Sequence, residues 1–128
     1  MKILALTDIH GAYTKAETII RSVPADVLVI GGDLTTVGTA REAGEAITQF
    51  MSLCKNVYCV AGNMDLPSHD DMFDRLGISI NGRGVLLGTI GFFGVSGAPH
   101  SPMRTPYEIS EEEITRRILR GYKDVAGA

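Results

Sequence analysis

The sequence has only two cysteines and no long hydrophobic run, and each of these features excludes a class of protein. Cys54 and Cys59 lack the Cys-x-x-Cys spacing of a structural zinc site, and two thiols make no disulfide framework, so we expect both to pack in the core. Asp8 and His10 interrupt the apolar start of the chain before a signal peptide or a membrane span can form. We therefore expect a cytoplasmic protein without a membrane partner.

Neither sign of charge dominates the sequence. Twelve Lys and Arg oppose 15 Asp and Glu, and the net charge of -3 is too small for a protein whose main partner is a nucleic acid. The length of 128 residues and the 45% hydrophobic content exclude a disordered chain and indicate one globular domain.

The first half of the chain alternates short apolar runs with amphipathic helical patterns. Apolar runs lie at residues 2–6, 27–30 and 56–60, and helical spacing of apolar residues covers 13–23 and 39–55. Because the connections are short, this order favours right-handed crossovers and a mainly parallel sheet with flanking helices, an α/β architecture. We expect the first strand to be buried on both faces.

The second half of the chain has a different pattern of predicted elements. A short helix is predicted around residues 71–76, followed by an antiparallel meander of three strands at 78–80, 84–87 and 90–95. A proline-containing loop covers 96–109. Ser110 and Glu113 then form the capping box of a last helix, with Ile114, Ile118 and Tyr122 on one face.

Acidic or amide side chains follow each of the first three predicted strands. Asp8 and His10 follow the first, Asp33 the second, and Asn63 and Asp65 the third. Because the carboxyl ends of parallel strands share one edge of the sheet, where ligands bind, we expect Asp8, His10, Asp33 and Asn63 to converge.

The types of these residues point to a metal site. In an extended chain Asp8 and His10 leave on the same side and can share one cation, while Ile9 points into the core. A carboxylate and an imidazole suit Mn, Fe or Zn better than Mg or Ca. Asp33, between the other two clusters, has two oxygens with which to bridge two cations.

Each residue alone also has an ordinary explanation. Asp8 could cap the following helix, His10 could be a partly buried loop histidine, Asp33 could stabilise a turn, and Asn63 could adopt a left-handed conformation. The order of all three clusters, each at the end of an apolar run, favours a metal site over these explanations.

The strings LTDIHG, VIGGDL and AGNMD resemble the Asp-x-His, Gly-Asp and Gly-Asn-His-Asp/Glu blocks of the calcineurin-like metallophosphoesterases. The resemblance implies part of that family's β-sandwich, with helix-sheet-sheet-helix layers. It implies a site for two divalent metals, with Asp8 and His10 on the first, Asp33 bridging and Asn63 on the second. Manganese is the first choice, with iron, zinc, nickel or magnesium as alternatives.

The same resemblance implies an enzyme that hydrolyses a small-molecule phosphoester through a metal-activated hydroxide. Asn63 and the metals would stabilise the developing charge. Met64 departs from the family, because this position usually holds a histidine that protonates the leaving group, and a thioether cannot donate a proton. Asp65, the carboxylate that would orient this histidine, loses its partner. Small family members without a histidine at this position look more like phosphodiesterases, so the resemblance favours phosphodiesters over phosphomonoesters. Asn63 and Asp65 are the candidate catalytic residues.

The second departure is the absence of the family's later histidine blocks, Gly-His or Ser-His and Gly-His-x-His. We therefore expect residues 1–128 to form a single, incomplete metallophosphoesterase domain with impaired catalysis. An exposed sheet edge would then favour a homodimer. The alternative function is an inactive binding or scaffold module. A metal-free nucleotide-binding domain ranks last, because no G-x-G-x-x-G or Walker lysine signature is present.

Two further histidines and an acidic run have simpler interpretations. His69 and His100 are expected to be solvated. Asp70, Asp71 and Asp74 are expected to mark the start of a helix, where the helix dipole favours negative charge.

Overall fold

The computed structural model describes all of residues 1–128 and contains four helices among seven short strands. In chain order the elements are β1 (Ile3–Leu6), α1 (Tyr13–Ser22), β2 (Val27–Ile30), α2 (Ala40–Leu53), β3 (Asn56–Cys59), α3 (Pro67–Arg75), β4 (Gly84–Leu87), β5 (Ile90–Phe93), β6 (Ala98–Pro99), β7 (Glu108–Ile109) and α4 (Glu111–Val125).

The central sheet is parallel, in the order β1-β2-β3. Its register pairs Leu6 with Ile30 and Ile30 with Cys59, so the three strands end at the same level. Buried Leu28, Ile30 and Val57 belong to one core cluster with residues of α1 and α2. The predicted α/β architecture with a parallel sheet and flanking helices is confirmed, and the ends of its strands form a common edge.

The first strand differs from the expectation of burial on both faces. Its residues alternate between exposed and half-buried, and the side chain of Ile3 is 46% exposed. The prediction was wrong because the edge strand β1 packs on the core only through the face with Leu4 and Leu6, while its other face, with Ile3 and Ala5, is exposed. A continuous apolar run does not distinguish an edge strand from a central one.

The predicted meander is only partly present. β4 and β5 form the expected antiparallel hairpin. Residues 78–80 instead continue the parallel sheet, because Cys59 donates its N–H to the Ile78 carbonyl (2.9 Å) and Ile80 donates to the Cys59 carbonyl (3.1 Å). Burial on both faces explains the difference, since Ile78 and Ile80 on one face are each 4% exposed and Ser79 on the other face is 5% exposed.

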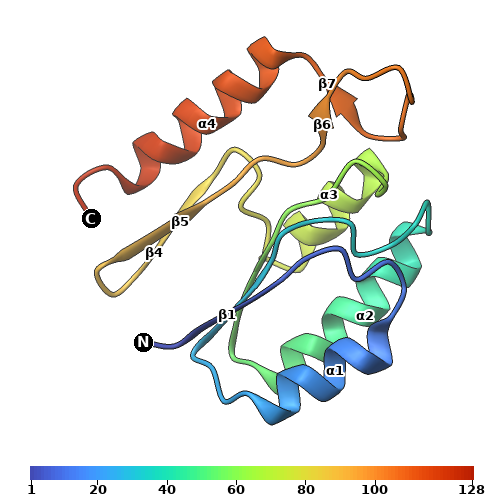
Figure 1. The fold of residues 1–128 in the computed structure, drawn as a ribbon. Coiled ribbons are helices and arrows are strands. Elements are labelled where there is room, and N and C mark those ends of the chain that lie inside the picture. The colour runs from blue at the N-terminus through green and yellow to red at the C-terminus, as the bar shows by residue number, and fades with distance from the viewer.

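The layers of the fold follow from these contacts. Figure 1 shows α1 and α2 side by side against the sheet, with the β4-β5 hairpin and α4 on the opposite side of the molecule. The rings of Tyr58 on β3 and Phe92 on β5 lie 5.1 Å apart and join the sheet to the hairpin. Helix α4 covers the hairpin. Half of its predicted capping box is present, with the Ser110 hydroxyl accepting from the Glu113 N–H (3.1 Å), whereas the Glu113 carboxylate accepts from Arg117 (3.0 Å).

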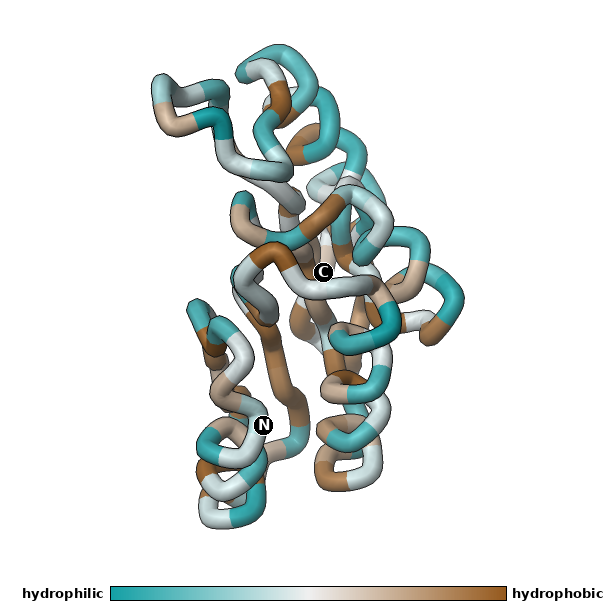
Figure 2. Tube along the Cα trace, turned by 90° about the vertical axis from the view of Figure 1, so that its right-hand side faces the viewer, coloured by the Kyte–Doolittle hydropathy of each residue, from teal (hydrophilic) through white to brown (hydrophobic).

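The helices are amphipathic, and hydrophobic and hydrophilic residues alternate along them in Figure 2. The longest, α4, has 15 residues, and no helix has both the length and the apolar composition that crossing a membrane requires. Cys54 and Cys59 are buried free thiols, as predicted.

Candidate metal centre

Three of the predicted ligands meet at the common edge of the sheet. Asp8, His10 and Asp33 each offer one ligand atom, and these atoms all lie within 4.8 Å of one another. His10 Nε2 is 3.5 Å from Asp8 Oδ1 and 3.8 Å from Asp33 Oδ2. The Asp33 side chain is only 14% exposed, whereas those of His10 and Asp8 are 38% and 60% exposed. We call these three residues the triad.

Backbone pairing between two loops builds the triad. The segment after β1 runs beside the segment after β2, with Asp8 N–H donating to the Gly32 carbonyl (3.1 Å) and His10 N–H to the Asp33 carbonyl (2.9 Å). The sequence suggested that Asp8 and His10 project from an extended chain. This prediction was wrong, because Asp8, His10 and Asp33 have left-handed φ of 56°, 45° and 51°. Left-handed backbone is uncommon at non-glycine residues, although Asp and His adopt it more readily than most, and such residues cluster at functional sites. Ile9 does point into the core, as predicted.

The remaining contacts leave one free ligand atom on each triad residue. Asp8 Oδ2 accepts from the Thr7 hydroxyl (2.8 Å), so Oδ1 is left to face His10. Asp33 Oδ1 accepts from the Met64 N–H (2.9 Å), so Oδ2 is left. Burial raises the pKa of Asp33, and the negative charges of Asp65 and Asp8 act in the same direction. A divalent cation would relieve this repulsion, so the donor set fits a metal such as Mn, Fe or Zn.

The ordinary explanations for Asp8 and Asn63 fail in the structure. Helix α1 has Ala12 at its N-terminal cap and no side-chain cap, so Asp8 does not cap it. The backbone of Asn63 does not have a positive φ, so this residue is not in the left-handed conformation. For Asp8 and Asn63 the metal-site interpretation is therefore favoured over these ordinary explanations.

Asn63 lies on the loop that follows β3, next to Asp33. Its two neighbours both approach Asp33: Met64 through its N–H, and Gly62 so closely that a Cβ atom would lie 2.0 Å from Asp33 Oδ1. Only glycine permits this approach. The Asn63 Nδ2 donates to the Thr105 hydroxyl (3.2 Å), so its other amide atom, Oδ1, has no protein partner.

Asp65 lies behind the triad. Its side chain is fully buried. Oδ1 accepts from the Thr35 N–H and hydroxyl (both 2.8 Å), and Oδ2 accepts from the N–H groups of Gly62 (2.8 Å) and Leu34 (3.2 Å). Burial opposes ionisation, yet contacts with His69, Gly62 and Thr35 outweigh it and lower the pKa of Asp65 to about 2. The carboxylate thus joins the loop after β2 to the loop after β3.

The prediction that His69 is solvated was wrong. Its side chain has no exposed surface. Nε2 lies 2.9 Å from the Gly38 carbonyl, and Nδ1 lies 3.3 Å from the Leu66 nitrogen and 3.6 Å from Asp65 Oδ1. The partners lie up to 31 positions away, which explains why the polar sequence around His69 did not reveal its burial. His100 is exposed, as expected.

The acidic run has a second role that the sequence did not indicate. Asp70 is 9% exposed and accepts from the Ser96 hydroxyl (2.7 Å) and the Tyr107 hydroxyl (2.5 Å), which belong to the segment between β5 and β7. Arg117 on α4 donates to the same Tyr107 oxygen (3.0 Å). Asp70 therefore ties α3 to the second half of the chain. The expected helix start holds only for Asp70, which lies in the first turn; α3 begins at Pro67, so Asp71 lies in its middle and Asp74 in its last turn.

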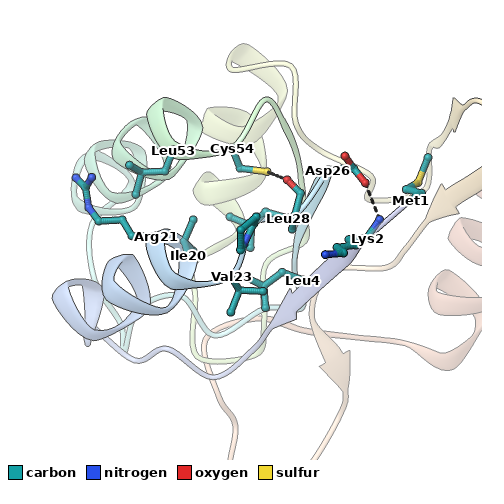
Figure 3. A pocket seen from close by; sticks show the side chains of 12 residues that line it. Met1, Lys2, Leu4, Ile20, Arg21, Val23, Asp26, Leu28, Leu53 and Cys54 are labelled. Atoms are coloured by element: carbon teal, nitrogen blue, oxygen red, sulfur yellow. Dashed lines mark hydrogen bonds between the residues drawn. The ribbon is translucent and has the colours of Figure 1, made fainter.

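The largest cavity of the molecule is not at the triad. It has a volume of about 680 Å³ and lies at the opposite end of the sheet, where Lys2 and Asp26 precede the first residues of β1 and β2. Figure 3 shows Leu4, Leu28 and Cys54 lining it. The Cys54 thiol there donates to the Ala25 carbonyl (3.7 Å). A smaller hollow of about 260 Å³ includes Asp8.

Fold and triad together define an α/β protein with a cluster of metal-ligating residue types at the carboxyl edge of a parallel sheet. The model of the calcineurin-like phosphoesterases matches residues 1–122, and the chain belongs to this family. This finding confirms the resemblance carried by the three motifs. The family acts on phosphoesters and binds divalent metals.

Two individual proteins are similar to the chain. The uncharacterized protein MJ1162 of Methanocaldococcus jannaschii is 33% identical over 125 residues, which are 98% of this chain and 56% of that relative. The crystal structure of TT1561 of Thermus thermophilus has the same fold, with a TM-score of 0.72 at 14% identity, over 94% of this chain and 61% of that one. The chain thus spans somewhat more than half the length of each.

Proposed function

We propose that this chain carries the first-metal half of a phosphoesterase centre that hydrolyses phosphodiesters in preference to phosphomonoesters. The observation that carries the proposal is the triad, in which Asp8 Oδ1, His10 Nε2 and Asp33 Oδ2 face one another without another partner. These three residues would hold the first cation. Asp33 and the Asn63 amide oxygen would bind a second cation, together with further ligands that the triad and Asn63 do not supply.

The residues of the chain have separate tasks in this proposal. A bound divalent cation, with manganese the first choice, lowers the pKa of water and withdraws charge from a phosphoryl oxygen. Asp33 is held by the Met64 N–H, and Asn63 is held by Thr105. Asp65, whose oxygens are all occupied, acts as a positioning residue for the two loops rather than touching the substrate.

Met64 supports the preference for diesters. It contributes its backbone to Asp33, and its thioether cannot protonate a leaving oxygen. The reaction therefore favours esters whose leaving group is stable as an anion. A diester also carries one negative charge fewer than a monoester dianion, so the carboxylates of Asp8 and Asp33 repel it less.

The test is hydrolysis of bis-p-nitrophenyl phosphate and p-nitrophenyl phosphate by the metal-stripped chain with added Mn²⁺. We expect turnover that depends on the metal, is faster for the diester and is abolished by Asp33→Asn. Asp71→Asn, on the exposed side of α3, is the matched control. Met64→His should weaken the dependence of the rate on the leaving group's pKa, because an imidazole can supply the proton.

The second candidate function is a binding or scaffold module, and Met64 is the observation that favours it. Binding of Mn²⁺ without turnover of either ester would support that function. Absence of Mn²⁺ binding would refute the ligand assignment itself.

A further inference from the structure

A hydroxyl group lies against the imidazole of the triad, on the side away from the carboxylates. Thr36 Oγ1 is 2.9 Å from His10 Nδ1. The other ring nitrogen, Nε2, faces Asp8 Oδ1 and Asp33 Oδ2. The ring is therefore oriented with one nitrogen toward the centre of the triad and the other toward Thr36.

The loop that carries Thr36 is held on both sides. Thr35 donates its N–H and its hydroxyl to the buried Asp65 carboxylate, each at 2.8 Å. Val37 donates its N–H to the Met64 carbonyl (2.7 Å) and has a left-handed φ of 53°. The exposed Thr36 hydroxyl is thus placed by a buried layer of hydrogen bonds and not by its own side-chain packing.

We propose that Thr36 is a positioning residue of the metal centre, whose hydroxyl accepts the Nδ1 proton of His10 and leaves the Nε2 lone pair for a divalent cation. The inference rests on the proposed function. A neutral imidazole that ligates through one nitrogen carries its proton on the other, and an acceptor at that proton sets the tautomer and the ring orientation. Loss of such a partner lowers metal affinity by about 10- to 100-fold.

The chain offers a matched set of variants for the test. Thr36→Val keeps the shape of the side chain but removes the hydroxyl, whereas Thr36→Ser keeps the hydroxyl. Thr14→Val removes a hydroxyl from an exposed position of α1 and is the control. Both positions are exposed, and circular dichroism verifies that the variants fold.

Mn²⁺ binding to the metal-stripped chain is measured by isothermal titration calorimetry. We expect Thr36→Val to weaken binding by about 10- to 100-fold, while Thr36→Ser and Thr14→Val bind as the wild type does. In the Zn²⁺-loaded protein the Nδ1 proton of His10 should give an NMR signal in the wild type and in Thr36→Ser. In Thr36→Val this proton should be lost to exchange with water.

Three other outcomes would each contradict one step of the inference. Equal Mn²⁺ affinity in the wild type and Thr36→Val overturns the role of Thr36 and leaves the metal centre intact. Equal weakening by Thr36→Val and Thr36→Ser also overturns it, because the hydroxyl would then not matter. A wild-type chain that binds no Mn²⁺ overturns the proposed function together with this inference.

Discussion

Asp65→Asn should destabilise the chain, because the Asp65 carboxylate accepts four hydrogen bonds in a fully buried place. The amide can keep its oxygen on the N–H groups of Gly62 and Leu34. Its NH₂ group can then donate to the Thr35 hydroxyl, but the Thr35 N–H loses its acceptor. A buried N–H without a partner costs about 1–3 kcal/mol, and loss of the charge from the remaining bonds adds about 1 kcal/mol. We therefore expect the free energy of unfolding to fall by about 2–4 kcal/mol.

The assay is urea denaturation followed by circular dichroism, at pH 7 and at acidic pH. The pKa of Asp65 is lowered from its ordinary 3.8 to about 2. A carboxyl group with a lowered pKa stabilises the fold above its ordinary pKa, and this stability is lost as the pH falls toward the folded value. The wild type should therefore lose more stability between pH 4 and 2 than Asp65→Asn does, since the amide does not titrate there.

The matched control is Asp71→Asn, which makes the same chemical change at an exposed position of the neighbouring helix. It should change the free energy of unfolding by no more than about 0.5 kcal/mol. The reasoning is refuted if Asp65→Asn is no less stable than this control at pH 7, or if it retains the acid sensitivity of the wild type.

Two predictions concern the backbone of the site. Val37→Gly should raise the free energy of unfolding by about 1 kcal/mol in the same assay, because a β-branched residue at a φ of 53° is strained and glycine is not; a loss of stability would show that the strain is absent. Gly62→Ala should lower Mn²⁺ affinity by about 10-fold or more, because its Cβ would lie 2.0 Å from Asp33 Oδ1 and displace that ligand. Gly77→Ala, where a Cβ meets nothing within 4 Å, should leave Mn²⁺ affinity unchanged, and equal affinity in both variants would contradict this placement of Asp33.

The sequence by itself determined the parallel sheet and the position of three candidate metal ligands. Alternation of apolar runs with helical patterns predicts the order β1 to β3, and the ends of parallel strands share one edge. Strand order alone therefore predicts that Asp8, His10 and Asp33 converge, and the structure brings them together. Their backbone conformation could not be predicted, because left-handed φ at all three depends on pairing between two loops.

Only the tertiary structure decided which polar residues are buried. Asp65, His69 and Asp70 lie in a polar stretch that resembles a solvated loop and helix start, yet the structure buries all three. Several of their partners, among them Thr35 and Tyr107, are 30 or more positions away in the sequence. A polar side chain can be buried only when such partners satisfy it, and local periodicity carries no information about partners at that distance. For the same reason the sequence does not predict the contact between Thr36 and His10, whose Oγ1 and Nδ1 atoms lie 2.9 Å apart in the fold.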